Sequence, residues 1–118
     1  MNVESVLFPD EPVIRLDNVN HSYVSGDNVL GDINMQLMPG SFTFLTGPSG
    51  SGKTTLLQLM YLAQKPRHGR VSLFGVDTTN TKRKDLTHLR RRIGVVYQDF
   101  RLLYHLTAYE NVALPLRV

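Results

Sequence analysis

Polar and apolar residues alternate along several short stretches of the chain, in the pattern of half-buried β-strands. Residues 41–46 alternate most clearly and are rich in β-branched and aromatic side chains. Residues 14–19 form a second short stretch of this kind, and residues 93–97 are an apolar run. All three stretches are predicted to be strands. Residues 55–63 contain strong helix formers and no Gly or Pro, which predicts a helix.

A glycine-rich segment separates the strand predicted at residues 41–46 from the helix predicted at residues 55–63. Residues 47–54 are Gly-Pro-Ser-Gly-Ser-Gly-Lys-Thr, which matches the phosphate-binding pattern G-x-x-x-x-G-K-[ST]. The alternative is a glycine-rich turn that contains a lysine by chance. Such a turn would need neither a threonine after the lysine nor a helix after the loop. Because strand, loop and helix occur together, the chain is predicted to bind a nucleoside triphosphate.

The residue types of this loop suit phosphate chemistry. Its glycines allow successive backbone N–H groups to turn inward around an anion, and the N-terminus of the following helix also favours phosphate. Lys53 is placed to reach the β- and γ-phosphates. The hydroxyl of Thr54 suits Mg²⁺, which prefers oxygen ligands, and Thr55 is placed for the α-phosphate.

Two further residues narrow the class of protein. Tyr23 lies shortly after the strand at residues 14–19, and Gln98 follows the run at residues 93–97. If each residue is considered by itself, Tyr23 is interpreted as a partly buried sheet residue and Gln98 as an ordinary loop glutamine. Their placement around the phosphate-binding loop resembles the nucleotide-binding domain of ATP-binding cassette (ABC) proteins. The resemblance implies that Tyr23 stacks on adenine and that Gln98 contacts the metal and its water.

The implied ligands are ATP and Mg²⁺, with Thr54 and Gln98 as metal contacts. The residues predicted to bind the nucleotide are Tyr23, Gly47, Pro48, Ser49, Gly50, Ser51, Gly52, Lys53, Thr54, Thr55 and Gln98.

Further stretches extend the resemblance. Residues 30–34 and 38–40 are similar to the strand and turn that lead into the loop of ABC proteins. Residues 67–71 and 74–77 are similar to the turn and strand after their first helix. The implied fold class is α/β: the N-terminal part of an ABC-type P-loop NTPase, with antiparallel strands added to a P-loop core, incomplete in this chain.

The resemblance covers residues 13–118, which are expected to form a partial nucleotide-binding domain running from the phosphate-binding loop through the glutamine loop. Residues 1–12, with two prolines, are expected to be a flexible lead-in. Thr107 and Glu110 form a capping box that predicts a helix start. A domain end at Val118, so soon after this start, is not expected, and the chain is interpreted as an N-terminal fragment.

Three elements of the family are absent from the sequence: a Leu-Ser-Gly-Gly-Gln-like signature, an apolar run that ends in Asp-Glu, and the histidine that follows it. Asp99 ends an apolar run but belongs to the glutamine loop, so it is given no metal role. No catalytic residue is assigned. We therefore expect nucleotide binding without appreciable hydrolysis, because phosphoryl transfer needs several groups at once.

Residues 89–103 and 109–116 resemble the FtsE family of bacterial cell-division ATP-binding proteins, whose partner is the membrane protein FtsX. Lipoprotein-releasing and macrolide-exporting ABC ATPases share the end of the second stretch and remain alternatives. The resemblance implies a cytoplasmic location on the inner face of the cell membrane and a homodimer of full-length subunits. Residues 100–106, which include His105, either receive a helix of the membrane subunit or pack against a helical subdomain.

The net charge of +3 comes with basic clusters at residues 82–84 and 90–92. These clusters are expected to be a solvated helix face, with an anionic lipid surface as the second interpretation. No helix-turn-helix, RNP or zinc motif supports a nucleic-acid partner, so none is expected. The hydrophobic fraction of 42% fits a folded protein, yet an incomplete sheet should leave apolar surface exposed and promote association.

Three functions remain open. The first is the ATP-binding part of an ABC complex, and the second is a non-catalytic module whose interactions depend on nucleotide. The third is a small P-loop kinase, which usually has an arginine-rich lid. Residues 90–92 are a poor lid because the predicted strand begins immediately after them.

Overall fold

The computed structural model describes residues 10–22 and 28–117. Four strands form one sheet in the order β2-β1-β3-β4, and every neighbouring pair is antiparallel. The strands are β1 (Ile14–Ser22), β2 (Asn28–Leu37), β3 (His68–Leu73) and β4 (Val76–Asp77). Tyr23 lies outside the described residues, as do residues 1–9 of the predicted lead-in.

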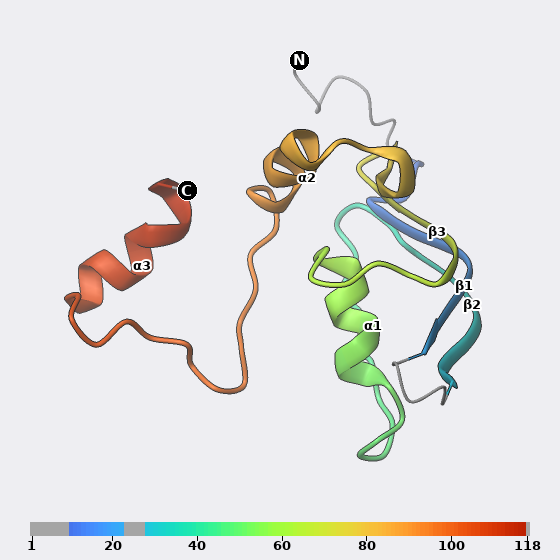
Figure 1. Ribbon diagram of the computed structural model, residues 1–118, viewed down its shortest axis with the longest axis horizontal. Helices are drawn as coiled ribbons and strands as arrows, with labels where there is room; N and C mark the ends of the chain where they lie inside the picture. Colours follow the sequence, from blue (N-terminus) through green and yellow to red (C-terminus); the bar gives the residue numbers. More distant parts are fainter. Residues whose placement is uncertain (1–9, 23–27, 118) are drawn as a thin grey trace.

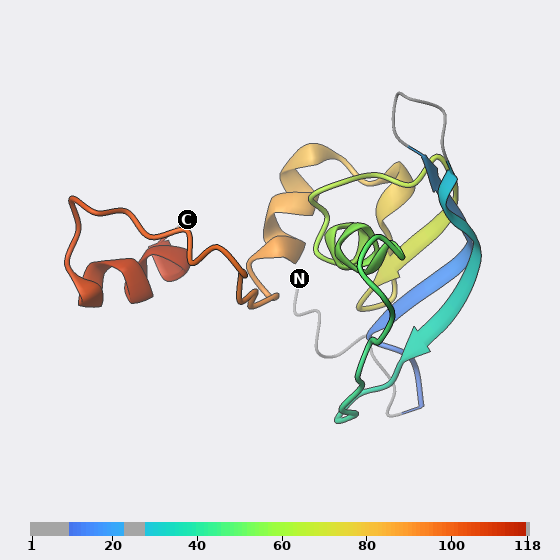
Figure 2. The same ribbon diagram turned by 90° about the horizontal axis from the view of Figure 1, so that it is seen from below.

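Helix α1 lies against one face of this sheet, and α2 lies beside it near β3 (Figure 1; Figure 2). Helix α3 stands apart at the end of an extended segment (Figure 1). The helices are α1 (Lys53–Met60), the 3₁₀ turn η2 (Thr78–Asn80), α2 (Arg83–Arg90) and α3 (Ala108–Arg117).

The core consists of two clusters of apolar side chains. The first joins α1 to the sheet and contains Leu16, Val19 and Leu59, each at most 1% exposed. The second joins α2 to the sheet through Leu73 and Leu86. The strand predicted at residues 14–19 is therefore confirmed as β1, at the centre of the core.

Helix α1 begins two residues before the predicted helix and ends three residues before its predicted end. It ends at Met60 because Leu62 adopts a left-handed backbone conformation with φ of 67°. The N–H of Ala63 donates to the carbonyl of Gln58 at 2.8 Å, and the N–H of Leu62 donates to the carbonyl of Leu59 at 3.4 Å. This pair of bonds is the Schellman pattern that closes helices.

Two predicted strands are absent, and the prediction is wrong for both: residues 41–46 and residues 93–97 have no regular structure. A strand is stable only when a neighbour pairs with its backbone, and within the described residues neither segment has such a neighbour. The side chains of Phe42, Phe44 and Val96 are accordingly 85%, 80% and 100% exposed. The expected exposed apolar surface is confirmed.

The predicted start of the last helix is confirmed. The N–H of Glu110 donates to Oγ1 of Thr107 at 3.1 Å, and the N–H of Thr107 donates to Oε1 of Glu110 at 3.2 Å. These are the two reciprocal bonds of a capping box. In residues 10–22 and 28–117, no helix is both long and apolar enough to cross a membrane.

The Leu59→Ala substitution is expected to lower the free energy of unfolding by about 2–5 kcal/mol, because it leaves a cavity between α1 and the sheet. Leu57→Ala, on the same helix at 48% exposure, is the matched control and should cost far less. Urea titration of both variants measures the difference. Equal losses would show that α1 does not pack against the sheet in this orientation.

Candidate nucleotide-binding site

The glycine-rich loop folds back on itself immediately before α1. The N–H of Ser51 donates to the carbonyl of Pro48 at 3.1 Å, and the N–H of Leu56 donates to the carbonyl of Gly52 at 2.9 Å. Gly52 is therefore the residue at which the loop becomes the helix. Because the first N–H groups of a helix have no partner within it, the loop presents backbone donors and the positive end of the α1 dipole together.

Gly52 is required here for two reasons. Its φ of 96° is a left-handed conformation that side chains disfavour, and a Cβ at this position would lie 2.9 Å from Cδ2 of Leu30 and 3.1 Å from the carbonyl oxygen of Val29. The loop is thus pressed against β2. This contact fixes where α1 begins relative to the sheet.

A cavity of about 510 Å³ opens in front of the loop. Its lining brings the loop together with Gln98, which lies more than forty residues later in the chain. The predicted nucleotide site contains both. The lining residues are Val29, Ser49, Gly50, Ser51, Gly52, Lys53, Thr54, Thr55 and Gln98.

Most of the predicted site residues therefore meet in one place. Gly47 and Pro48 are not among the residues that line the cavity, and their carbonyl oxygens accept from the ammonium group of Lys53. Tyr23 was also predicted to belong to the site, but it lies outside the described residues. Val29 was missed by the sequence reasoning, since nothing in its surroundings distinguishes it from other strand residues.

Lys53 bends back over the loop. Its ammonium group donates to the carbonyl oxygens of Gly47 and, at 3.0 Å, of Pro48. These neutral acceptors are weak partners for a cation compared with an ionised group. Lys53 can therefore exchange them for phosphate oxygens without leaving a buried charge, because its side chain is only partly buried.

Gln98 is held near the loop by the residue before it. The ring of Tyr97 packs edge-to-face on Tyr61, just after α1, with ring centroids 6.1 Å apart. The guanidinium of Arg101 lies 4.1 Å from the centre of the Tyr97 ring, and its Nε donates to Asp99 at 3.3 Å. Asp99 thus pairs with Arg101, in keeping with its assignment to the glutamine loop.

The residues present fit a magnesium ion that is bound mainly through phosphate and water. Thr54 and Gln98 bring a hydroxyl and an amide oxygen to the same cavity, and both residues are exposed. Mg²⁺ keeps several waters and needs few protein ligands when phosphates are present. Within the described part of the chain, no cluster of His, Cys, Asp and Glu offers an alternative metal site.

Comparison with known proteins gives consistent results. A family model described as ABC transporter matches residues 30–117. The cell division ATP-binding protein FtsE of Bacillus subtilis is 40% identical over 106 residues, which are 90% of this chain and 46% of that protein. FtsE of Escherichia coli is 40% identical over 104 residues, which are 88% of this chain and 47% of that protein.

Among solved structures, a dimeric bacterial ABC transporter cassette, MJ0796, superposes with a TM-score of 0.82 at 40% identity and covers 88% of this chain and 47% of that one. The same cassette has been solved in a post-hydrolysis state bound to ADP and Pi. The chain spans about half the length of the curated relatives it matches.

The Gly52→Ala substitution is expected to lower the free energy of unfolding by about 1–3 kcal/mol, because it forces a side chain into a left-handed position against β2. NMR spectra should also show displaced amide signals for residues 49–55. Ser51→Ala, in the same loop, is the control: it should leave the free energy of unfolding nearly unchanged and displace only the amide signals next to the substitution. A Gly52→Ala spectrum that superposes on that of the unsubstituted chain would contradict the observed loop geometry.

Proposed function

Because the chain belongs to the ABC transporter family, we propose that it binds Mg²⁺-ATP in the cavity in front of α1, as the nucleotide-binding part of an ABC subunit. One observation carries this proposal: the phosphate-binding loop and Gln98 line the same cavity. The related cassette bound to ADP and Pi supports it.

Each group in the cavity has a proposed role. The backbone N–H groups of residues 49–55 surround the phosphates, Lys53 neutralises the β- and γ-phosphates, and Thr54 with Gln98 holds Mg²⁺. Tyr23 stacks on adenine in this proposal. Charge-assisted hydrogen bonds contribute about 1.5–3 kcal/mol each. A few of them support micromolar affinity, which corresponds to about −8 kcal/mol.

The cellular role is proposed from the relatives. Their FtsE names support a place in bacterial cell division, on the inner face of the cell membrane, with a polytopic membrane partner resembling FtsX. The dimeric cassette supports a homodimer in the full-length form. A lipoprotein-releasing or macrolide-type exporter ATPase is the alternative within the same family.

The side chains of Phe100 and Tyr104 are 80% and 95% exposed on the segment after Gln98. In the proposed complex, this segment receives a cytoplasmic helix of the membrane subunit. The alternative is that it packs against a helical subdomain. Both assignments are compatible with two exposed aromatic rings, and both place residues 100–104 at an interface.

A non-catalytic, nucleotide-dependent interaction module is the second candidate function. It is favoured by the composition of the cavity, because none of the described residues that line it is acidic. Hydrolysis needs a group that orients the attacking water, in addition to positive charge around the phosphates.

The Lys53→Ala substitution should weaken Mg²⁺-ATP binding by at least about tenfold, because it removes a charge-assisted contact. Titration calorimetry of the folded chain measures the affinity. Lys65→Ala, which removes an exposed lysine from the turn before β3, is the matched control and should bind ATP as the unsubstituted chain does. Unchanged affinity in Lys53→Ala would place the nucleotide elsewhere or exclude it.

The purified chain should release no inorganic phosphate from ATP above the background of its Lys53→Ala variant. The reason is that the cavity lacks an acidic side chain among the described residues. A phosphate-release assay at saturating Mg²⁺-ATP measures this. Turnover that disappears in Lys53→Ala would refute the non-catalytic assignment while leaving nucleotide binding intact.

A further inference from the structure

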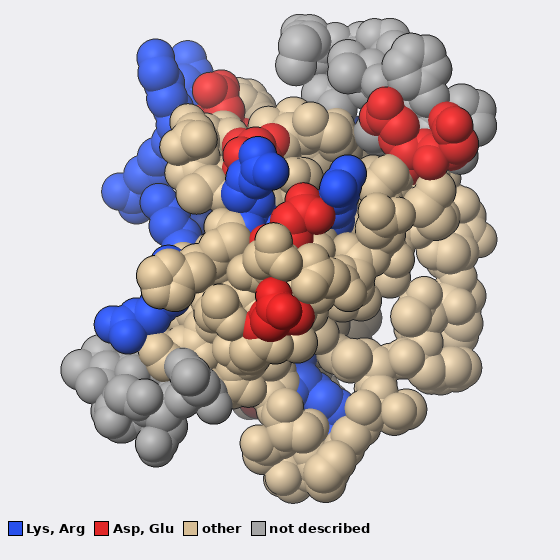
Figure 3. Space-filling view, turned by 90° about the vertical axis from the view of Figure 1, so that its right-hand side faces the viewer, with Lys and Arg blue, Asp and Glu red and all other residues tan. Residues whose placement is uncertain are grey.

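The positive charge of the chain is concentrated in one short segment. Residues 82–92 contain six of the thirteen basic residues and one of the ten acidic residues. This segment therefore has a formal charge of +5, and the rest of the chain has a formal charge of −2. On the face shown in Figure 3, most of the blue Lys and Arg side chains lie toward the left, with others near the centre and at the bottom.

Packing turns these charges outward. Helix α2 buries Leu86 and Leu89 in the second apolar cluster, where they are 6% and 5% exposed. Lys82, Lys84 and His88 are exposed instead. A helix fixed by two buried leucines presents its charged side in a constant orientation, which a mobile basic tail would not.

The exposed side of α2 borders a hollow. A cavity of about 930 Å³ is lined by Lys82, Lys84, His88 and Arg92, and among the described residues Asp85 is its one acidic side chain. Asn80 and Thr81, which precede α2, add polar groups that can bond to oxygen atoms. Arg92 is held in place, because its guanidinium lies 3.9 Å from the centre of the Phe74 ring. The hollow thus combines an excess of positive charge with neutral hydrogen-bonding groups.

We propose that this basic hollow docks on the phosphate-bearing headgroups of an anionic lipid bilayer. Charge complementarity carries the inference, since several Lys and Arg side chains gathered at one surface bind anionic lipids. The open hollow, with its amide and hydroxyl groups, accommodates phosphates that project from a surface.

A nucleic acid is the competing anion, and the lining disfavours it. Proteins that bind single strands pair a basic groove with aromatic rings on which bases stack. No Phe, Tyr or Trp lines this hollow in the described part of the chain, and the ring of Phe74 nearby is covered by Arg92. The hollow therefore offers contacts to phosphate but none to bases.

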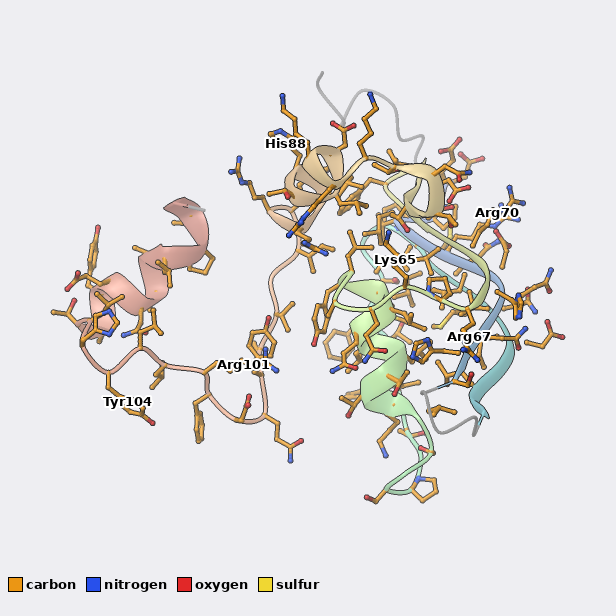
Figure 4. The ribbon with its side chains drawn as sticks, viewed as in Figure 1. Lys65, Arg67, Arg70, His88, Arg101 and Tyr104 are labelled. Carbon is orange, nitrogen blue, oxygen red and sulfur yellow. The ribbon has the colours of Figure 1, made fainter. Side chains whose placement is uncertain are left out.

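The lipid surface is independent of the nucleotide site. None of the described residues lines both cavities. Figure 4 also shows that His88 on α2 lies well away from Lys65, Arg67 and Arg70. Lys65 and Arg70 are exposed basic residues that lie outside the hollow. They provide a control pair of equal charge elsewhere on the molecule.

Cosedimentation of the full chain with vesicles tests the proposal. Phosphatidylglycerol vesicles should bind the chain, phosphatidylcholine vesicles should not, and added salt should weaken the binding. The double substitution Lys82→Glu and Lys84→Glu should weaken it by at least about tenfold. Lys65→Glu with Arg70→Glu changes the net charge equally and should retain most of the binding. The double substitution Lys82→Gln and Lys84→Gln, which removes the charges without reversing them, should give vesicle binding of intermediate strength.

Circular dichroism and Mg²⁺-ATP affinity accompany each measurement. Both should be unchanged in the Lys82 and Lys84 variants, so that a failure of lipid docking is distinguishable from a failure of nucleotide binding. If both pairs of Glu substitutions weakened vesicle binding equally, the proposal would be overturned, because net charge rather than the hollow would then determine the binding. Absence of binding to phosphatidylglycerol would also overturn it, as would tighter binding to single-stranded RNA than to the vesicles.

Discussion

The burial of one face of α1 against the antiparallel sheet is the interaction on which the candidate site depends. Leu56, Leu59 and Met60 face Leu16 and Val19 in the same cluster. Burying a leucine or methionine side chain contributes about 1.5–3 kcal/mol. These contacts seat the helix, and the seated helix places its N-terminus at the cavity. The phosphate-binding loop is then fixed at one end by α1 and along its side by the contact between Gly52 and β2.

The other side of the loop is held differently. Residues 41–46, which lead into it, have no hydrogen-bonded neighbour among the described strands. Gln98 reaches the cavity from a segment that also lacks strand pairing, and the edge-to-face contact of Tyr97 with Tyr61 holds this segment to the end of α1. The site is thus fixed by packing where it meets α1 and β2. Among the described residues, its remaining side is held by the contact between Tyr97 and Tyr61 and by the Arg101 guanidinium above it.

Local signals in the sequence predicted much of this arrangement. The loop pattern, the placement of Gln98 and the capping box at Thr107 each depend on residues close together in the chain or on a strong motif. The fold class was implied by the resemblance to ABC proteins and is confirmed by the structural relatives. What could not be predicted are features that depend on distant partners. Residues 41–46 and 93–97 have the composition of strands, but composition does not supply the neighbour that a strand requires.

Side-chain roles that arise only in three dimensions were also missed. The side chain of Asn111 accepts from the N–H of Leu103 at 2.9 Å and donates to the carbonyls of Leu103, Leu106 and Thr107. It thereby ties the segment after Gln98 to the first turn of α3. No periodicity marks an asparagine for such a role. In the same way, the basic clusters at residues 82–84 and 90–92 gave no hint that a hollow lies beside them.

The central claim is that the loop and Gln98 form one nucleotide site. Titration of the isotopically labelled chain with Mg²⁺-ATP, followed by NMR, tests it most directly. The claim predicts that the largest shifts occur at the backbone amides of residues 49–55 and at the side-chain amide of Gln98, at the same ATP concentrations. Shifts confined to other elements, or a loop that responds without Gln98, would contradict it.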